Sequence, residues 1–224
     1  VVLATKIAGV GDYTKHIRSG GFTKQNILEA VEGSLKRLKT DYLDLYHLHW
    51  PERGVNCFGV RDYPFKSSTK EAENHLEILE TLNSLITQGK IKHIGLSNET
   101  PWGTMKYLQT SEANNLPKPV TIQNSYSLIH RGYEVGMSEV SMRENIGLLA
   151  YSPLAQGVLT GKYLNGKNPE GARGTLFPNF IARYKNKGSI KAVAEYQKIA
   201  QKHNLSLTEL SLAFINQLPF VTSN

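Results

Sequence analysis

The feature that most constrains the fold of this chain is a regular alternation between apolar, β-branched runs and amphipathic helical runs. Strands that alternate with helices pack as βα units around a parallel sheet, so the sequence predicts an α/β fold. Five runs have the length and composition of buried strands: 1–7, 42–49, 91–97, 121–124 and 147–152. A sixth strand is expected to begin at residues 219–221.

The segments between the strands contain helix signals of different strength. Residues 23–38, 102–114 and 135–144 have helical apolar spacing, and a further helix is expected to stop at Gly89. Near the carboxyl end, Ser206 and Glu209 form an S-x-x-E capping box, and Ser189 is expected to cap the helix before it. Residues 160–188 are rich in Gly, Asn and Pro, so we expect a long loop of the kind that often covers a functional site.

Six strands are too few to close a (β/α)8 barrel, which needs eight strands and typically about 250 residues. The chain has 224 residues, of which 40% are hydrophobic, which is enough for one large domain. An unpaired edge on a buried strand is unfavourable, which argues against a naturally open sheet. We therefore expect one domain spanning 1–224 in which the first and last strands of a barrel are missing.

Each of the five strands ends in polar residues: Lys6, then His49, then Ser97 with Asn98, then Gln123 with Asn124, then Tyr151 with Ser152. The carboxyl ends of parallel strands face one crevice, so these side chains are candidates for an active site. Lys6 is the least expected of them, because a lysine inside an apolar strand must be paired or functional. A histidine in the position of His49 can orient or polarise a carbonyl oxygen.

Two other classes of site were weighed against this interpretation. His47 lies two residues before His49 and faces the same side of the strand, which suggests a metal site, but zinc needs three or four ligands and none of the right type accompanies the pair. The net charge of +7 suits an anionic ligand, yet the basic residues are scattered and no nucleic-acid-binding motif accompanies them. We expect no metal and no nucleic acid, and a phosphorylated small cofactor explains the sign of the charge.

Composition also bears on location. The chain has no apolar run near the ~20 residues of a membrane helix, and its start lacks the regions of a signal peptide. Cys57 is the single cysteine of the sequence, which rules out an internal disulfide and fits a reducing compartment. We expect a cytoplasmic protein without membrane association. The sequence does not indicate an oligomeric state.

Several motifs in order along the chain carry a resemblance to a known family. They are ATK at 4–6, LKRLKTDYLDLYHLHWP at 35–51, GKIKHIGLSN at 89–98, IQNSYS at 122–127 and LLAYSPLAQGVLTGKY at 148–163. Together they resemble the aldo-keto reductases, and the segments HWPERGVNCFG and SNET are most similar to the Tas-like branch of that family. The resemblance spans nearly the whole chain.

The resemblance implies a TIM barrel that transfers hydride between NADP(H) and an aldehyde or ketone. Lys6 is similar to the lysine that lowers the pKa of a proton-donating tyrosine, and His49 to the histidine that orients the substrate carbonyl. Ser97, Asn98 and Gln123 match positions that hold the nicotinamide carboxamide, and Tyr151 matches the aromatic residue stacked on the nicotinamide. The segment that wraps the pyrophosphate would include Ser152, Leu154, Gly157 and Leu159.

Two family residues have no counterpart in this sequence. The tyrosine and its partner aspartate lie, in the family, after a strand that would precede Val1, and Tyr13 is not assigned the role because it belongs to the loop after the Lys6 strand. An alternative function is therefore an inactive barrel that acts as a binding or regulatory module. The substrate is expected to be a small carbonyl compound whose identity depends on loop shape.

Overall fold

The computed structural model describes residues 1–12, 14–17, 20–60, 62–63 and 74–224. They form two compact units, Val1–Gln123 and Asn124–Asn224, and the boundary falls within strand β4. Tyr13 and most of the sequence from 61 to 73 lie outside the described residues.

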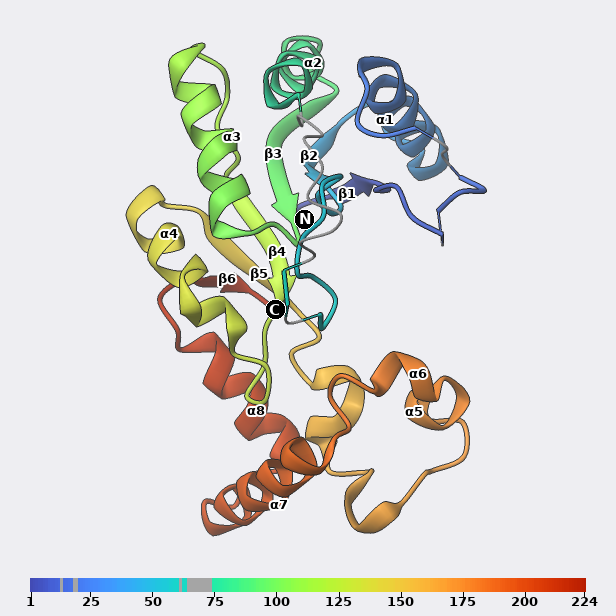
Figure 1. The fold of residues 1–224 in the computed structure, drawn as a ribbon, viewed down its shortest axis with the longest axis vertical. Helices are drawn as coiled ribbons and strands as arrows, with labels where there is room; N and C mark the ends of the chain where they lie inside the picture. The colour runs from blue at the N-terminus through green and yellow to red at the C-terminus, as the bar shows by residue number, and fades with distance from the viewer. Residues whose placement is uncertain (13, 18–19, 61, 64–73) are drawn as a thin grey trace. The chain divides into compact units, whose positions relative to one another are not determined.

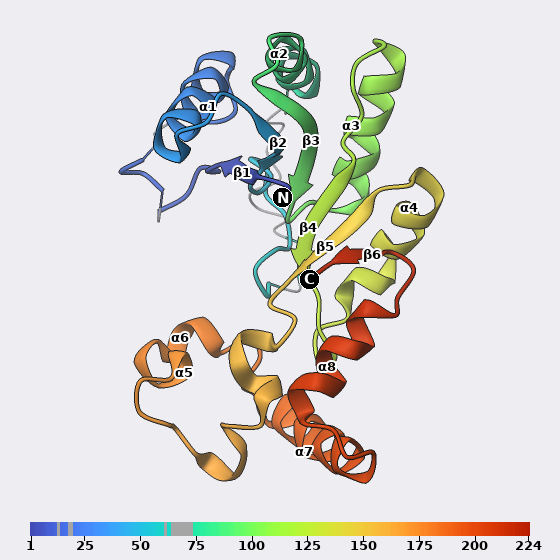
Figure 2. The same cartoon turned by 180° about the vertical axis from the view of Figure 1, so that it is seen from behind.

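The first unit is built from βα repeats. Its elements are β1 (Ala4–Ile7), α1 (Lys24–Leu38), β2 (Leu43–Leu48), α2 (His75–Thr87), β3 (Ile91–Ser97), α3 (Pro101–Ala113) and the start of β4 (Thr121–Ser125). The strands β1, β2, β3 and β4 lie side by side in chain order and pair in parallel. Helices α1, α2 and α3 follow one another in a row, each in contact with the next (Figures 1 and 2).

Local chemistry explains where these helices begin. Thr23 precedes α1 and its hydroxyl accepts a hydrogen bond from the Asn26 backbone N–H. Thr100 does the same for Gly103 at the start of α3, where Pro101 supplies a suitable first residue. The helices then bury the apolar face that the sequence pattern predicted, including Ile27 in α1.

The second unit contains two strands and several helices. Its elements are η1 (Gly132–Val135), α4 (Met137–Glu144), β5 (Gly147–Tyr151), η2 (Ala155–Thr160), η3 (Leu164–Gly166), α5 (Arg173–Leu176), α6 (Pro178–Ile181), α7 (Lys187–Lys202), α8 (Leu207–Asn216) and β6 (Val221–Ser223). Strands β5 and β6 pair in parallel. The capping box of Ser206 and Glu209 at the start of α8 is confirmed.

Three predictions about elements were wrong. The segment 160–188 is not a loop without structure: it contains η3, α5 and α6, and it buries Tyr163, Ile181 and Tyr184 in a hydrophobic cluster. Ser189 does not cap α7. The side chain of Asn186, three residues earlier, accepts the bond from the Ser189 backbone N–H, so the helix begins sooner.

The third error concerns the start of the first strand. β1 begins at Ala4 rather than Val1, and Val1 and Val2 are exposed rather than buried. The helix expected around 135–144 is confirmed as α4, which begins at Met137 because Gly136 before it has a φ of 149°, a value that no helix contains.

The six described strands alternate with helices and all their recorded pairings are parallel. This confirms the predicted α/β class, as in part of a (β/α)8 barrel. That 1–224 forms one barrel domain stays a prediction. No helix in the part of the chain that the structure describes is long and apolar enough to cross a membrane.

Candidate active site

Lys6, the next-to-last residue of β1, meets Gln123, which is the central residue of β4 rather than its end as expected. Lys6 is half-buried in β1, and its Nζ donates a hydrogen bond to Oε1 of Gln123 on β4 at 2.5 Å. Burial lowers the pKa of the Lys6 ammonium below its ordinary value. The lysine that looked misplaced in an apolar strand therefore has a polar partner from another candidate residue.

His47 lies on β2 beside Lys6 and is almost completely buried, with 1% of its surface exposed. Its Nε2 is 3.3 Å from Oγ1 of Thr121 on β4. Gly95 on β3 leaves the space for the ring, since a Cβ at that position would collide with the imidazole. Burial, assisted by the charge of Lys6, lowers the pKa of His47 to about 4, so the ring is neutral at physiological pH.

His49 follows directly after β2 and is half-buried. Its ring lies against Trp50, with 4.2 Å between the ring centroids. Burial first, and then the charge of Lys6, lower the pKa of His49 to about 4. A neutral imidazole in this position can donate one N–H to a carbonyl oxygen, as the predicted role requires.

Ser97 and Asn98 connect β3 to both of its neighbours. The Ser97 hydroxyl donates to the backbone carbonyl of Gln123 at 2.8 Å. Asn98 has a φ of 53°, in the left-handed region that asparagine tolerates, and its Nδ2 donates to the backbone carbonyl of His49 at 2.9 Å and to the Ser97 hydroxyl at 3.1 Å. The structure thus brings together all five candidates of the first unit: Lys6, His49, Ser97, Asn98 and Gln123.

Tyr151 is the last residue of β5 in the second unit. Its backbone carbonyl accepts from the Tyr126 N–H at 3.2 Å, and its ring is half-exposed. The guanidinium carbon of Arg183 lies 6.0 Å from the centre of that ring and 4.7 Å from the ring of Tyr184. The hydroxyl of Tyr184 is hydrogen-bonded to Ser125, 2.9 Å away at the end of β4.

The backbone after Tyr151 turns repeatedly through the left-handed region. Ser152, Ala155, Gln156 and Gly157 all have φ between 48° and 94°. Such turns make concave backbone surfaces that can receive an anion.

At two of the positions predicted to wrap the pyrophosphate, the backbone N–H group already forms a hydrogen bond within the turn. The backbone N–H groups of Gly157 and Leu159 both donate to the carbonyl of Leu154, at 2.9 and 3.2 Å. The Leu159 side chain is buried in the hydrophobic cluster that includes Tyr163. These residues shape the turn, and Ser152 is the candidate here with a polar side chain that is half-exposed.

Sequence reasoning missed two groups beside the candidates. Arg53 and Glu99 form an ion pair between the loops after β2 and β3, and Arg183 lies against Tyr151. The signal for the first was the position of Glu99 directly after Asn98. The second had no local signal, because residues 151 and 183 are brought together only by the folding of the segment between them.

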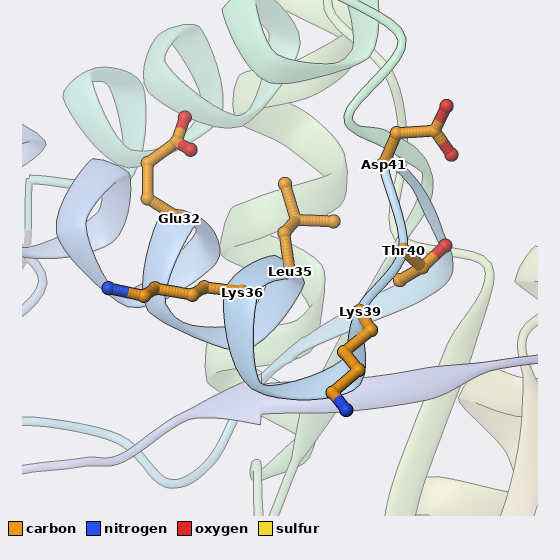
Figure 3. A pocket seen from close by; sticks show the side chains of 6 residues that line it. All are labelled: Glu32, Leu35, Lys36, Lys39, Thr40 and Asp41. Atoms are coloured by element: carbon orange, nitrogen blue, oxygen red, sulfur yellow. The ribbon is translucent and has the colours of Figure 1, made fainter.

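Two other features carry no chemistry of this kind. Within the described ranges, no three His, Cys, Asp or Glu side chains come together as a metal site. A hollow of about 590 Å³ lies at the end of α1, lined by Glu32, Leu35, Lys36, Lys39, Thr40 and Asp41 (Figure 3). The hollow precedes the start of β2, whereas the candidate residue His49 follows the end of that strand.

Comparison with known proteins agrees with the resemblance seen in the motifs. Over the full chain, the sequence is 48% identical to Protein tas of Escherichia coli K12 and to Protein tas of Shigella flexneri, and it spans 64% of the length of each. It is 40% identical to an aldo-keto reductase of Babesia bovis, of which it covers 83%. The model of the Aldo/keto reductase family matches residues 1–223. The chain therefore belongs to the aldo/keto reductase family of oxidoreductases.

Proposed function

We propose that this chain supplies the active site of an NADP(H)-dependent carbonyl reductase, which reduces aldehydes or ketones to alcohols by hydride transfer. The observation that carries the proposal is the hydrogen-bonded group at the ends of β1 to β4. Lys6 is bonded to Gln123, and His49 is bonded through its carbonyl to Asn98. A catalytic pair and two cofactor contacts are thereby held in one network.

In this proposal the protein orients the reactants and polarises the carbonyl, while the nicotinamide supplies the hydride when bound. His49 donates a hydrogen bond to the substrate carbonyl oxygen, and its lowered pKa keeps it neutral for that purpose. Lys6 is half-buried, and its positive charge stabilises the ionised form of a neighbouring proton donor. The charge therefore lowers the pKa of that donor. Such help from a tuned acid typically contributes about 10²- to 10⁴-fold.

The residues present fit a nicotinamide dinucleotide. The side-chain amides of Asn98 and Gln123 and the Ser97 hydroxyl are of the kind that pairs with a carboxamide. The Asn98 Nδ2, the Ser97 hydroxyl and the Gln123 Oε1 would exchange their present bonds for those to the cofactor, whereas the Gln123 Nε2 lies outside those bonds. The half-exposed ring of Tyr151 offers a stacking surface. Ser152 begins the left-handed turns that would approach the pyrophosphate, with Leu154, Gly157 and Leu159 shaping them.

The first test is NADPH binding, followed by fluorescence, for the 224-residue chain beside the full reading frame that contains it. We expect the longer protein to bind NADPH and to reduce a small aldehyde. Binding without turnover, or no binding by either form, would favour the alternative of an inactive barrel that acts as a binding or regulatory module. Tight binding by both forms would show that the described residues already hold the whole cofactor.

The proposal includes the partners and place of action. The substrate is a small carbonyl compound, and neither nucleic acid nor a membrane takes part. A cytoplasmic location follows from the proposed reaction, since a reductase of this kind draws on the cytoplasmic supply of reduced cofactor. Cell fractionation tests this location. Finding the protein in a membrane or secreted fraction would contradict it.

A further inference from the structure

An ion pair joins the loops that follow β2 and β3. The Arg53 guanidinium donates to both carboxylate oxygens of Glu99, with 3.1 Å between Nη1 and Oε2 and a second bond from Nη2 to Oε1. Nη2 also donates to the Thr100 hydroxyl at 3.0 Å. Only 14% of the Arg53 side chain and 4% of the Glu99 side chain are exposed. A two-pronged pair shielded from water fixes its geometry far better than a surface pair does.

The surroundings hold this pair in place. The Trp102 ring covers the guanidinium, with 5.0 Å from its centre to the Arg53 Cζ. Any side chain at Gly103 would collide with both Arg53 and Glu99. The Glu99 carboxylate also accepts from the Thr100 backbone N–H at 2.7 Å, next to the start of α3, where the helix dipole favours a negative charge.

The ion pair is adjacent in sequence to two candidate site residues. Glu99 follows Asn98, and Arg53 is four residues after His49. The bond from Asn98 Nδ2 to the His49 carbonyl joins the same two loops a second time. Two contacts thus join the loops: the Asn98–His49 hydrogen bond within the candidate site and the Arg53–Glu99 ion pair next to it.

The loop after β2 is also fastened on its other side. The indole N–H of Trp50 donates to the Val10 carbonyl at 2.9 Å, in the loop after β1. The carboxylate of Glu52, next to Arg53, accepts from the backbone N–H of Phe22 at 2.7 Å. These anchors hold the β2 loop on the side of β1, and the ion pair supports the Asn98–His49 bond in fixing its separation from the β3 loop.

We propose that Arg53 and Glu99 are positioning residues for carbonyl reduction, because their ion pair holds His49 and Asn98 at the separation that the reaction requires. The proposal rests on the proposed function of this site. Neither side chain is assigned a contact with substrate or cofactor. Displacing a reacting group by about 1 Å can cost roughly 10²-fold in rate, so a loosened pair has a measurable effect.

The test uses three variants of the full protein that carries this sequence: Arg53→Met, Glu99→Gln, and the double variant Arg53→Met with Glu99→Met. Each single change removes one side of the ion pair and leaves the other charge buried, so we expect a lower melting temperature and a kcat reduced about 10²-fold. The double change removes both charges, so the melting temperature should recover while kcat stays low. Lys92→Met is the matched control, because it breaks the exposed pair of Lys92 with Asp44.

A second measurement does not depend on activity. Hydrogen exchange of the Asn98 side-chain amide, followed by NMR, reports its bond to the His49 carbonyl, and we expect faster exchange in all three variants but not in the control. If the parent protein reduces no carbonyl compound, the proposed function fails while this exchange still tests the positioning. Unchanged exchange in the three variants, or a double variant that recovers kcat together with stability, would overturn the inference.

Discussion

The candidate group of the first unit and one segment of the second unit differ in how their polar side chains are paired. In Val1–Gln123 the candidate groups are bonded to one another, as Lys6 is to Gln123. The basic segment, residues 151–191 of the second unit, has seven lysines and arginines against one acidic residue, Glu170. Within the described chain, the ion pairs recorded include none of these seven cations, and four of them lie over aromatic rings instead: Lys162, Arg173, Arg183 and Lys185.

This difference separates two tasks. Groups fixed by mutual hydrogen bonds can orient a reacting carbonyl without reorganising during the reaction, which favours the rate. Cations that lie over aromatic rings are not neutralised by a carboxylate, so their charge can attract an incoming anion, which favours binding. Under the proposed function, the groups of the first unit serve the chemistry and the basic segment attracts the cofactor phosphates. Most of the net charge of the sequence lies in this one segment.

The largest effect is expected from removing the side chains to which the chemistry is assigned. Lys6→Met or His49→Ala should lower kcat by about 10²- to 10⁴-fold, because each deletes a polarising or pKa-tuning group, while NADPH affinity stays close to that of the parent. Steady-state consumption of NADPH with an aldehyde measures the first quantity and fluorescence titration the second.

The control for these variants is His93→Ala, which removes an exposed histidine from β3 in the same unit. Its kcat and its NADPH affinity should both match the parent. Unchanged turnover in both the Lys6 and the His49 variants would remove the assignment of chemistry to the first unit.

Removing charge from the basic segment should have the complementary effect. Lys162→Met and Arg183→Met should each raise the NADPH dissociation constant about tenfold, the loss expected for one charge-assisted contact. The kcat at saturating NADPH should be retained, and added salt should weaken binding by the parent more than by the variants.

Lys198→Met is the control for charge removal, since Lys198 is an exposed residue of α7 already paired with Glu195. It should leave the dissociation constant unchanged. If the Lys162 and Arg183 variants bind as tightly as the control, the basic segment does not serve the cofactor.

Acid should weaken the first unit through its buried histidine. The pKa of His47 is about 4 in the folded chain because of burial and the charge of Lys6, against about 6.5 when exposed. Between these values the unfolded chain binds the proton more readily, so the free energy of unfolding falls as pH drops from about 6.5 towards 4. His47 alone contributes a loss of roughly 3 kcal/mol, at about 1.4 kcal/mol for each unit of pKa, and His49, whose pKa is also lowered to about 4, adds a loss of the same sign.

Urea unfolding at pH 7 and pH 5 measures this loss. His47→Gln should reduce the difference between the two pH values, whereas His203→Gln, at an exposed position after α7, should not. An equal pH dependence in both variants would mean that His47 is not the group responsible.

The sequence predicted the regular parts of the molecule well, because their signals are local. β3 has the predicted bounds, Ile91–Ser97, since a buried apolar run there is enclosed between a turn and a polar end. The polar residues at the ends of β1 to β4 were expected to meet, and they do. Their functional roles came from the family resemblance and stay proposals.

What the sequence did not predict depends on contacts between distant residues. Arg53 and Glu99 are 46 positions apart, and no periodic pattern links them. Tyr163 and Tyr184 are buried together although the segment between them is rich in turn-forming residues. Residues 160–188 are packed because a few of their apolar side chains contact partners distant in sequence, although the local composition is typical of a loop.

The start of α7 permits the smallest and most specific test, because sequence and structure assign its cap to different residues. The Asn186 side chain accepts from the Ser189 N–H at 3.0 Å, so Asn186→Ala should lower the free energy of unfolding by about 1 kcal/mol. Ser189→Ala keeps that backbone N–H and should change stability by less than about 0.5 kcal/mol. Both variants should keep the parent kcat, since the cap supports the fold of the second unit and the chemistry is assigned to the first. Equal losses of stability would show that the Ser189 hydroxyl contributes as the sequence pattern suggested, and a loss of kcat in either variant would show that the two tasks are not separate.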